Sequence, residues 1–310
     1  MGRRFSKGYL FLIILLVIAA YQSGVPKDRE PGAKRTPNVI LGSVAKLEES
    51  WRRQAVPYTG GLPWQEDPRT KAVLKRYGAT VIMAAFRATL QEPIEGEAHN
   101  IALAAERLSG TVLQPGQVFS QNGSLGPYTE NRGYRAGPTY MGNRYVTTIG
   151  GGVCKISSLL YNVVIFSDLR VIERHPHSMT VPYVPPGQDA TVYYGFRDFK
   201  FQNTTDGPVV IAARFVDKTL YMALYGRRKP PEIRWHHRVL KRVPAWTEQH
   251  LNPELPPGKT RVVMEGQEGI VVRSWITIKT PAGKTTVKKL GTDWYDPSPR
   301  IVEYGPARRG

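Results

Sequence analysis

Three consecutive glycines, Gly150 to Gly152, stand just before Cys154, the only cysteine in the 310-residue chain. Glycine tolerates tight turns, and the apolar residues that follow this turn recur at the spacing of one helix face. These apolar residues are Leu159, Leu160, Val163 and Val164. The pattern predicts a helix that begins near Val153, with Cys154 in its first turn.

The predicted position of Cys154 favours a reactive thiol. A cysteine at the positive end of a helix dipole has a lowered pKa and a larger thiolate fraction. Gly151 and Gly152 let a substrate backbone approach and leave amide donors open, so we assign them to substrate binding. The alternative is that Cys154 is an unreactive residue of the apolar core, where a cysteine behaves as a small hydrophobic side chain.

Two polar residues downstream complete a candidate catalytic set. His177 and Asp189 each stand beside or within a predicted strand. A cysteine on a helix, followed by a histidine and a carboxylate on strands, is the chain order of papain-like and transglutaminase-like enzymes. We predict Cys154 as nucleophile, His177 as base and Asp189 as the group that orients the imidazole. His175 remains a rival for His177.

The histidines do not indicate a metal site. One cysteine with His175 and His177 lacks the paired ligand spacing of a closed zinc site. We therefore predict neither a metal nor any other cofactor.

A glycine- and proline-rich stretch from 121 to 140 reads as a long loop, and long loops inside compact domains are usually functional. If it lines the mouth of a cleft at Cys154, it supplies four candidate substrate contacts, for which solvated surface is the alternative. These are Tyr128, Arg132, Tyr134 and Arg135. Tyr161 is a further candidate, because two turns along a helix it faces the same way as Cys154.

The net charge predicts an anionic partner. Lys and Arg number 43 against 25 Asp and Glu, which gives +18 and a pI near 10.0. Nucleic acid, an acidic membrane surface and anionic wall polymers all fit such a charge. The chain has no zinc-finger spacing, basic helix with interleaved aromatics or aromatic RNA-binding signature, which disfavours nucleic acid.

The first residues predict export. Basic residues precede an uncharged apolar run from Tyr9 to Ala20, as in a secretory signal or a short membrane anchor. The large Ile18 makes cleavage after Ala20 unfavourable, and extension of the run to Val25 approaches spanning length. We expect an uncleaved anchor in the cell membrane with the basic end inside and the rest outside; secretion to the cell wall is the alternative.

Composition divides the chain into four segments. Residues 1–25 are the anchor, and 26–65 form a polar linker rich in Pro and Gly. Residues 66–228 are predicted as a papain-like or transglutaminase-like α+β domain of helices and antiparallel sheet. Residues 229–310 are predicted as an elongated all-β domain, with the boundary in the basic, proline-rich stretch 227–231.

Periodicity places the elements of the α+β domain. Helices are predicted over 69–77 and 101–108, in addition to the one that begins near residue 153. Strands are predicted over 79–90, 170–174, 179–184, 190–195, 209–216 and 219–226. The clearest alternation lies in the last two strands, which indicates an antiparallel sheet against the helices.

Ordered motifs between about Val81 and Gly226 resemble the VanW family, named for an accessory protein of some vancomycin-resistance gene clusters. The motifs are Asn100 to Gly110, Pro115 to Ser120, Gly126-Pro127, Gly133-Tyr134, Gly150 to Cys154, Leu160 to Asn162, Glu173 to His175, His177-Ser178, Tyr183 to Pro185, Gly187, Asp189 to Val192 and Asp198 to Asn203. The resemblance implies an exported envelope protein of Gram-positive-type bacteria, linked to peptidoglycan. The family usually has glutamine after the cysteine, whereas Lys155 stands here. This change removes a candidate oxyanion donor, and the lysine is an alternative means of lowering the cysteine pKa.

The C-terminal segment is similar to the G-five domain, a cell-surface module named for five glycines. These are Gly258, Gly266, Gly269, Gly283 and Gly305. The resemblance implies an elongated β domain that binds amino-sugar polymers. Its aromatic residues offer faces for sugars or form its small core, and its basic residues suit anionic wall polymers or prevent edge pairing. The aromatics are Trp235, Trp246, Trp275, Trp294 and Tyr295; the basic residues are Lys259, Arg261, Lys284, Lys288 and Lys289.

Two functions of different class follow from these patterns. The first is cysteine-dependent acyl transfer or amide cleavage on peptidoglycan stem peptides. The second is a non-catalytic wall-binding or scaffolding protein, in which the glycine-rich segment only shapes a pocket. The reactivity of Cys154 separates them, because a structural thiol is inert and a catalytic one titrates below the ordinary cysteine pKa.

Overall fold

The computed structural model describes residues 57–90, 92–141 and 144–307. The predicted anchor at 1–25 and most of the predicted linker at 26–65 lie outside the described residues. Across the ranges described, no helix combines the length and apolar character needed to cross a membrane.

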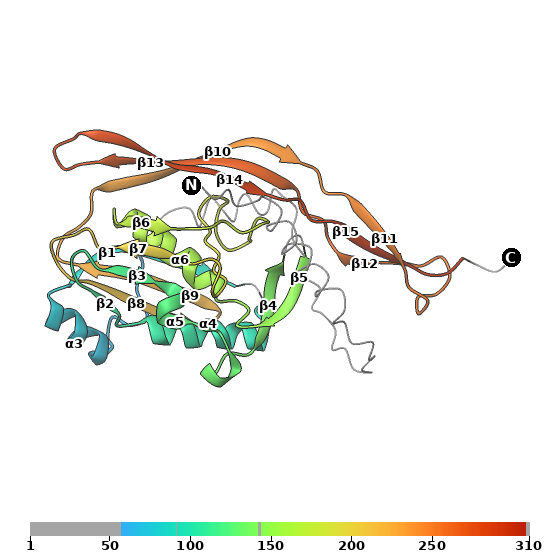
Figure 1. Cartoon of the computed structure of the whole chain (residues 1–310), viewed down its shortest axis with the longest axis horizontal. Helices are drawn as coiled ribbons and strands as arrows, with labels where there is room; N and C mark the ends of the chain where they lie inside the picture. The colour runs from blue at the N-terminus through green and yellow to red at the C-terminus, as the bar shows by residue number, and fades with distance from the viewer. Residues whose placement is uncertain (1–56, 91, 142–143, 308–310) are drawn as a thin grey trace, which may run out of the picture. The chain divides into compact units, whose positions relative to one another are not determined.

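A four-stranded antiparallel sheet forms the centre of the N-terminal part, which comprises residues 57–226 (Figure 1). Its strands, in spatial order, are β1 (Val81–Thr89), β9 (Thr219–Gly226), β8 (Val209–Val216) and β2 (Val112–Leu113). Successive side chains on a strand point to opposite faces. On β1, Phe86 joins one apolar cluster and its neighbour Ala85 joins another. Both faces of the sheet are therefore buried, which explains the nearly continuous apolar sequence of β1, β8 and β9.

Two helices, α4 (Glu95–Leu108) and α6 (Cys154–Phe166), pack against one face of this sheet. Every residue from Lys155 to Phe166 is buried, as expected for a helix that is largely apolar all round. The predicted helix start near Val153 is confirmed. The helix predicted over 101–108 begins earlier than expected, at Glu95.

The opposite face is covered by residues 57–65 and by helix α3 (Pro68–Tyr77). Asp67 caps α3 by accepting a hydrogen bond from the amide of Arg69, as the Asp-Pro pair predicts. Leu62 and Trp64, which the sequence places at the end of the linker, are buried against the sheet. This segment therefore contributes to the core.

Small elements surround the central sheet. Strands β3 (Val118–Ser120), β7 (Lys200–Gln202) and β6 (Arg170–Glu173) form a three-stranded sheet, and β4 (Ala136–Met141) pairs with β5 (Arg144–Ile149). The prediction of an unstructured loop over 121–140 is wrong, because the stretch contains α5 (Gln121–Leu125), the 3-10 helix η1 (Glu130–Arg132) and most of β4.

The strands predicted over 179–184 and 190–195 are also wrong, because both stretches are turns and irregular backbone apart from one isolated bridge. Pro182, Pro185 and Pro186 lack the amide hydrogens that a strand ladder needs. Their neighbours are apolar because they are buried. His177 and Asp189 therefore lie on loops.

The C-terminal part, residues 232–304, consists of strands in its described elements. One sheet has the order β10 (Glu232–Val243), β13 (Gly269–Lys279) and β14 (Thr285–Tyr295). The other has the order β11 (Thr247–Leu251), β15 (Arg300–Tyr304) and β12 (Thr260–Met264). The C-terminal part has a small buried cluster of its own, formed by Ile270, Val272 and Tyr295. The predicted α+β architecture with antiparallel strands and a β-rich C-terminal part is thus observed.

The packing of residues 57–65 can be tested at Tyr225. The buried indole nitrogen of Trp64 donates a hydrogen bond of 2.8 Å to the Tyr225 hydroxyl. Tyr225→Phe leaves this indole N–H unpaired, so we expect a loss of about 1–3 kcal/mol in the free energy of unfolding. Denaturant titration measures it. Tyr221→Phe on the same strand, at a half-buried position, is the matched control; equal losses in both variants would contradict the prediction.

Candidate active site

The helix start that carries Cys154 is held in place by α4. Asn100 is fully buried there, and its side-chain amide donates to the carbonyl oxygens of Arg135 at 2.8 Å and Gly151 at 2.9 Å. The backbone amide of Arg135 donates back to the side-chain oxygen Oδ1 of Asn100 at 2.8 Å. One side chain thus joins α4, the segment that enters β4 and the glycine turn.

Backbone conformation and close packing within the domain explain why positions 150 to 152 are glycines. Gly150 and Gly152 have φ of 81° and 104°, a region that L side chains rarely adopt. A Cβ at Gly151 would lie 2.1 Å from the carbonyl oxygen of Gly137. The space that the sequence analysis assigned to a substrate backbone at Gly151 is therefore filled by β4.

Cys154 is half-buried at the edge of the core. Its Sγ lies 3.4 Å from the Thr191 hydroxyl and 3.5 Å from the carbonyl oxygen of Val192. Burial raises the pKa of the Cys154 thiol. A hydrogen bond with His177 and the charge of that ring lower the pKa, and the net result is a pKa of about 7. The thiolate therefore forms at a pH well below that of an ordinary cysteine.

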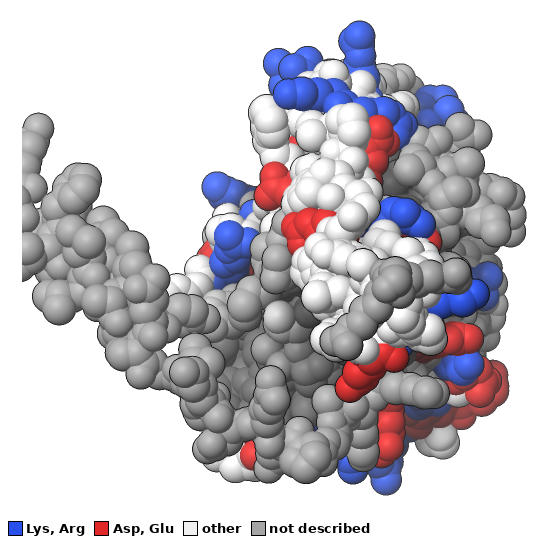
Figure 2. All heavy atoms as spheres, turned by 90° about the vertical axis from the view of Figure 1, so that its right-hand side faces the viewer, with Lys and Arg blue, Asp and Glu red and all other residues white. Residues whose placement is uncertain are grey.

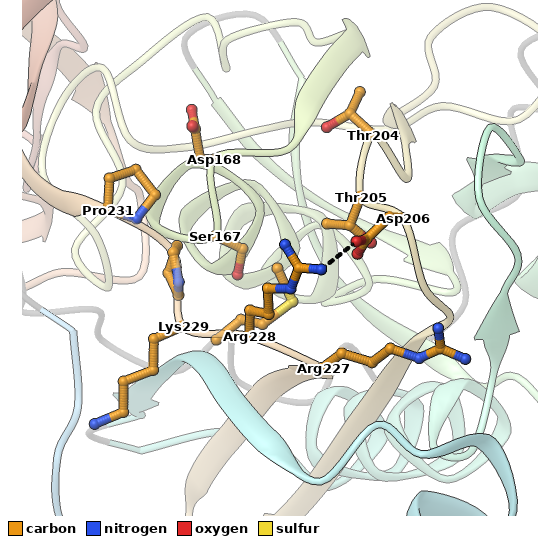
Figure 3. Close-up of a pocket in the computed structure, with 11 residues that line it drawn as sticks. Ser167, Asp168, Thr204, Thr205, Asp206, Arg227, Arg228, Lys229 and Pro231 are labelled. Carbon is orange, nitrogen blue, oxygen red and sulfur yellow. Dashed lines mark hydrogen bonds and ion pairs between the residues drawn. The ribbon is translucent and has the colours of Figure 1, made fainter. Parts of the chain in front are cut away.

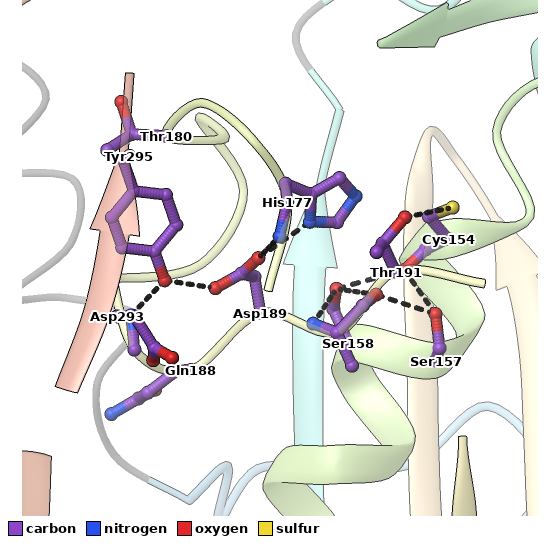
Figure 4. Close-up of polar contacts among 12 residues, drawn as sticks. Cys154, Ser157, Ser158, His177, Thr180, Gln188, Asp189, Thr191, Asp293 and Tyr295 are labelled. Carbon is purple, nitrogen blue, oxygen red and sulfur yellow. Dashed lines mark hydrogen bonds and ion pairs between the residues drawn. The ribbon is translucent and has the colours of Figure 1, made fainter. Parts of the chain in front are cut away.

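His177 lies between Cys154 and Asp189 (Figure 4). Its Nδ1 is 2.6 Å from Asp189 Oδ2, and the same oxygen accepts the His177 backbone amide at 2.7 Å. Burial lowers the pKa of His177, whereas the bonds to Asp189 and Cys154 raise it to about 9. Each group shifts the pKa of the other toward its charged form, so the contact favours a thiolate beside an imidazolium.

The Asp189 carboxylate is fully buried and has several partners. Its Oδ1 accepts from Arg174 Nη2 at 3.0 Å and from the Tyr295 hydroxyl at 2.5 Å. Burial raises the pKa of Asp189, but the Arg174 charge, followed by the bonds with His177, holds it well below the ordinary range. The carboxylate is therefore ionised, and it fixes the tautomer of His177 by accepting from Nδ1.

Two serines of α6 fasten the segment after Asp189 to the helix. Ser157 and Ser158 donate to the carbonyl oxygen of Ala190 at 2.7 and 3.1 Å, and the amide of Ala190 donates to Ser158 Oγ at 3.0 Å. Both hydroxyls are also 2.9 Å from the carbonyl oxygen of Cys154. The carboxylate loop and the cysteine helix are thus tied together one turn from the sulfur (Figure 4).

Comparison with known proteins identifies both parts of the chain. The family profile described as "VanW like protein" matches residues 96–225, and the "G5 domain" profile matches 237–307. This chain carries a VanW-like domain followed by a G5 domain.

Individual relatives match in part. YoaR of Bacillus subtilis is 31% identical over 187 residues, which cover 60% of this chain and 61% of YoaR. Vancomycin B-type resistance protein VanW of Enterococcus faecalis is 29% identical over 144 residues, which cover 45% of this chain and 52% of that protein. The solved G5 domain of an IgA1 protease is 27% identical and covers 27% of this chain and all of its own, with a TM-score of 0.18. The chain thus spans about three fifths of YoaR and about half of the enterococcal protein.

The two candidate histidines of the VanW-like domain contact different carboxylates. His177 bonds Asp189, whereas His175 Nε2 lies 3.0 Å from Glu173 Oε1. Lys155 pairs with Glu97 in the interior and lies over the ring of Tyr183. The Glu97 carboxylate thus balances the charge of Lys155, and the groups that lower the cysteine pKa are His177, Thr191 and the Val192 backbone.

The three candidate tyrosines of the VanW-like domain differ in position. Tyr128 is half-buried. Burial is the main cause that raises the pKa of its hydroxyl, and the charge of Cys154 adds to this effect. Tyr134 is buried and donates to the carbonyl oxygen of Leu125, so solvated surface is wrong for this residue. Tyr161 is buried with its ring 5.2 Å from that of Trp235. Tyr134 and Tyr161 therefore occupy core positions.

An exposed aromatic turn near the sulfur was missed by the sequence analysis. Tyr193, Tyr194 and Phe196 are 60, 49 and 80% exposed, and the turn begins directly after Val192. The signal in the sequence is an aromatic pair followed by glycine and phenylalanine, and the aromatic pair and the glycine fall in the strand predicted over 190–195. Arg174 and Asn100 were noted only as parts of motifs.

A pocket of the described structure lies away from Cys154. It has a volume of about 340 Å³ and is lined by Ser167, Asp168, residues 204–206 and residues 227–231, with Arg228 paired to Asp206 at 2.7 Å (Figure 3). Ser167 follows the C-terminal end of α6, whereas Cys154 begins it. A helix of 13 residues is about 20 Å long, so this pocket is separate from the thiol.

The tryptophans of the C-terminal part, residues 232–304, divide between core and surface. Trp235 packs against the VanW-like core, whereas Trp246 and Trp294 are 42 and 65% exposed. Trp275 stacks on His236 at 5.4 Å, and Tyr295 is buried. Both alternatives of the sequence analysis thus occur, at different residues.

The close packing of the glycine turn can be tested with Gly151→Ala. The new methyl group would collide with backbone that has no flexible side chain to move aside, so we expect a loss of about 1–3 kcal/mol in the free energy of unfolding. Denaturant titration measures it. Gly61→Ala is the matched control, because the nearest atom to its Cβ is Gln65 Oε1 at 3.6 Å. A Gly151→Ala protein as stable as this control would contradict the packing argument.

Proposed function

We propose that this chain is an exported envelope protein that performs cysteine-dependent acyl transfer or amide cleavage on peptidoglycan stem peptides. The observation that carries the proposal is the hydrogen-bonded series of the half-buried Cys154 at the start of α6 and the buried His177 and Asp189. The order of the three residues along the chain is that of papain-like and transglutaminase-like enzymes, and we propose chemistry of that type.

The proposed reaction uses the ion pair directly. The Cys154 thiolate attacks the carbonyl carbon of an amide, and a C–S bond forms. His177, as imidazolium, gives its proton to the amide nitrogen, the C–N bond breaks and the amine leaves. Water or a second amine then attacks the thioester while His177 takes its proton, and the C–S bond breaks to restore the thiolate. Asp189 stabilises the imidazolium throughout and keeps its own charge.

Backbone amides at the start of α6 suit the oxyanion of this reaction. The amides of Val153, Lys155 and Ile156 bond carbonyl oxygens within the turn. Among the hydrogen bonds of the described residues, none engages the amide of Cys154, and no described side chain caps the helix. A free amide at a helix start donates to developing negative charge, and here it takes the place of the glutamine that Lys155 replaces.

The envelope setting is supported by both domains. The VanW-like domain relates the chain to a protein named for vancomycin resistance, and residues 237–307 match the G5 domain profile. The exposed rings of Tyr193, Tyr194 and Phe196 lie on the turn that follows the sulfur contacts and offer apolar faces to a wall fragment. We propose the extracytoplasmic side of the cell membrane, with the N-terminal segment as anchor, as the location.

A second candidate function, binding of anionic wall polymers without catalysis, is favoured by the outer face of the β10-β13-β14 sheet. Arg238 and Arg273 are exposed and lie directly opposite each other on β10 and β13. Trp275 of β13 lies opposite His236 of β10, on which its ring stacks, and opposite Lys289 of β14. Like charges opposite each other on a sheet are unfavourable, which an anionic ligand relieves. Figure 2 shows Lys and Arg gathered at its top, the side where Figure 1 draws this sheet.

Alkylation of Cys154 tests the catalytic proposal. In the wild type we expect the alkylation rate to rise with a midpoint near pH 7, because His177 stabilises the thiolate. His177→Ala removes this support but keeps the thiol half-buried, so the midpoint moves above about 8.5, the ordinary cysteine value. Rates with iodoacetamide across pH 5 to 10 measure both midpoints.

His175→Ala is the matched control and is expected to keep the wild-type midpoint, because His175 contacts Glu173. The same proteins are incubated with peptidoglycan fragments, and Cys154→Ser is expected to abolish release of stem peptides. A wild-type thiol that reacts only as the protein unfolds would reject the catalytic function and leave the binding function.

Binding to the basic face is tested separately. Arg238→Gln with Arg273→Gln is expected to weaken binding of poly(glycerol phosphate) about tenfold, or about 1.4 kcal/mol, because two facing charges are lost. Calorimetry at physiological salt measures the affinity. Arg69→Gln with Arg76→Gln makes the same charge change on the exposed surface of α3. Equal weakening in both double variants would mean that net charge alone attracts the polymer.

A further inference from the structure

The G5 domain reaches the buried carboxylate of the VanW-like domain. Tyr295, the last residue of β14, donates its hydroxyl hydrogen to Asp189 Oδ1 at 2.5 Å. The same hydroxyl oxygen accepts the backbone amide of Gly187 at 2.7 Å. One side chain of the G5 domain thus holds both the carboxylate and the loop that carries it (Figure 4).

A second contact between the domains runs through Arg174. Its Nη2 lies 3.0 Å from Asp189 Oδ1, and its Nη1 lies 2.6 Å from Oδ1 of Asp293 in β14. The side chains of Arg174 and Asp293 are only 11 and 13% exposed. Because one guanidinium charge is shared between two carboxylates, Asp293 limits how strongly Arg174 draws Asp189 away from His177.

The surface where the domains meet is not built for stability alone. A Cβ at Gly187 would lie 2.2 Å from Ser274 Oγ in β13. Buried polar atoms of Gln188, Ser274 and His237 have no hydrogen-bond partner among the described residues. Such atoms cost free energy, and an apolar surface would avoid the cost. The Tyr295 and Asp293 contacts are polar as well, so polar groups form much of this surface.

We propose that the G5 domain completes the active site, with Tyr295 as a positioning residue that holds Asp189 against His177. The proposal rests on the cysteine-dependent function and extends it, because the domain that binds the wall then also sets the state of the nucleophile. A VanW-like domain without this contact keeps Cys154 and His177 but has a less firmly held carboxylate.

The charged and titratable groups around the ion pair come from several elements. Those of the VanW-like domain are Glu97 on α4, Tyr128, Lys155 and Tyr161 on α6, Arg174, Tyr183 and Asp189; those of the G5 domain are Asp293 and Tyr295. Only the last two belong to β14, so changes there test the contribution of the G5 domain.

The test is the pH profile of Cys154 alkylation in the full chain carrying Tyr295→Phe. Without the hydroxyl, Asp189 turns from His177, the imidazolium loses support and the thiolate becomes harder to form. We expect the midpoint to rise by about one pH unit, so that the rate at pH 7 falls about fivefold. A merely structural role would lower the unfolding temperature and leave this midpoint unchanged.

Two further variants make the result decisive. Tyr304→Phe makes the same chemical change elsewhere in the G5 domain, at a position 40% exposed, and is expected to keep the wild-type midpoint. Asp293→Asn is expected to raise the midpoint as Tyr295→Phe does, because Arg174 is then balanced by Asp189 alone; it replaces Tyr295→Phe if that protein does not fold.

The outcomes separate this proposal from the function on which it rests. A wild-type midpoint near pH 7 that both β14 variants leave unchanged overturns the positioning role but keeps the catalytic function. A wild-type thiol with no depressed midpoint overturns the catalytic function itself. Midpoints that rise in both β14 variants, with Tyr304→Phe unchanged, support the composite site.

Discussion

The organisation of the VanW-like domain depends on one buried carboxylate, that of Asp189. A charge fully removed from water is tolerated only when opposite charges and hydrogen-bond donors surround it. Arg174, His177 and Tyr295 supply these partners from a strand end, a loop and the other domain. The irregular path of residues 174–190 follows from this requirement, because a regular strand would not bring all of these donors to one oxygen pair.

The sequence predicted the elements whose signals are local. The helix at Cys154, the strand pair at 209–226 and the cap at Asp67 follow from periodicity and turn chemistry, and all are observed. The order of Cys154, His177 and Asp189 was also visible, because all three lie in motifs within 36 residues of one another. Local patterns suffice where a residue's partners are close in the chain.

The errors share a physical cause. Residues 179–184 are buried apart from Pro182, so they are nearly as apolar as a strand. Pro182 lacks the amide hydrogen of a ladder, and the Thr180 carbonyl oxygen accepts from the Gln267 side chain in place of a neighbouring strand. Gly151 is glycine because Gly137 passes beside it, and Tyr295 meets Asp189 across 106 residues of chain. No pattern in a single sequence records contacts at such distances.

The two faces of the β10-β13-β14 sheet divide two tasks. Its inner face carries Trp235 and Ile276 against the VanW-like core, whereas its outer face carries the Arg238 and Arg273 pair. A ligand on the outer face therefore contacts the sheet whose last strand holds Asp189 through Tyr295. A packed sheet transmits small shifts poorly unless its packing has two arrangements. We therefore propose that outer-face binding mainly concentrates the wall polymer near the thiol, and that the inner face keeps that thiol ionised.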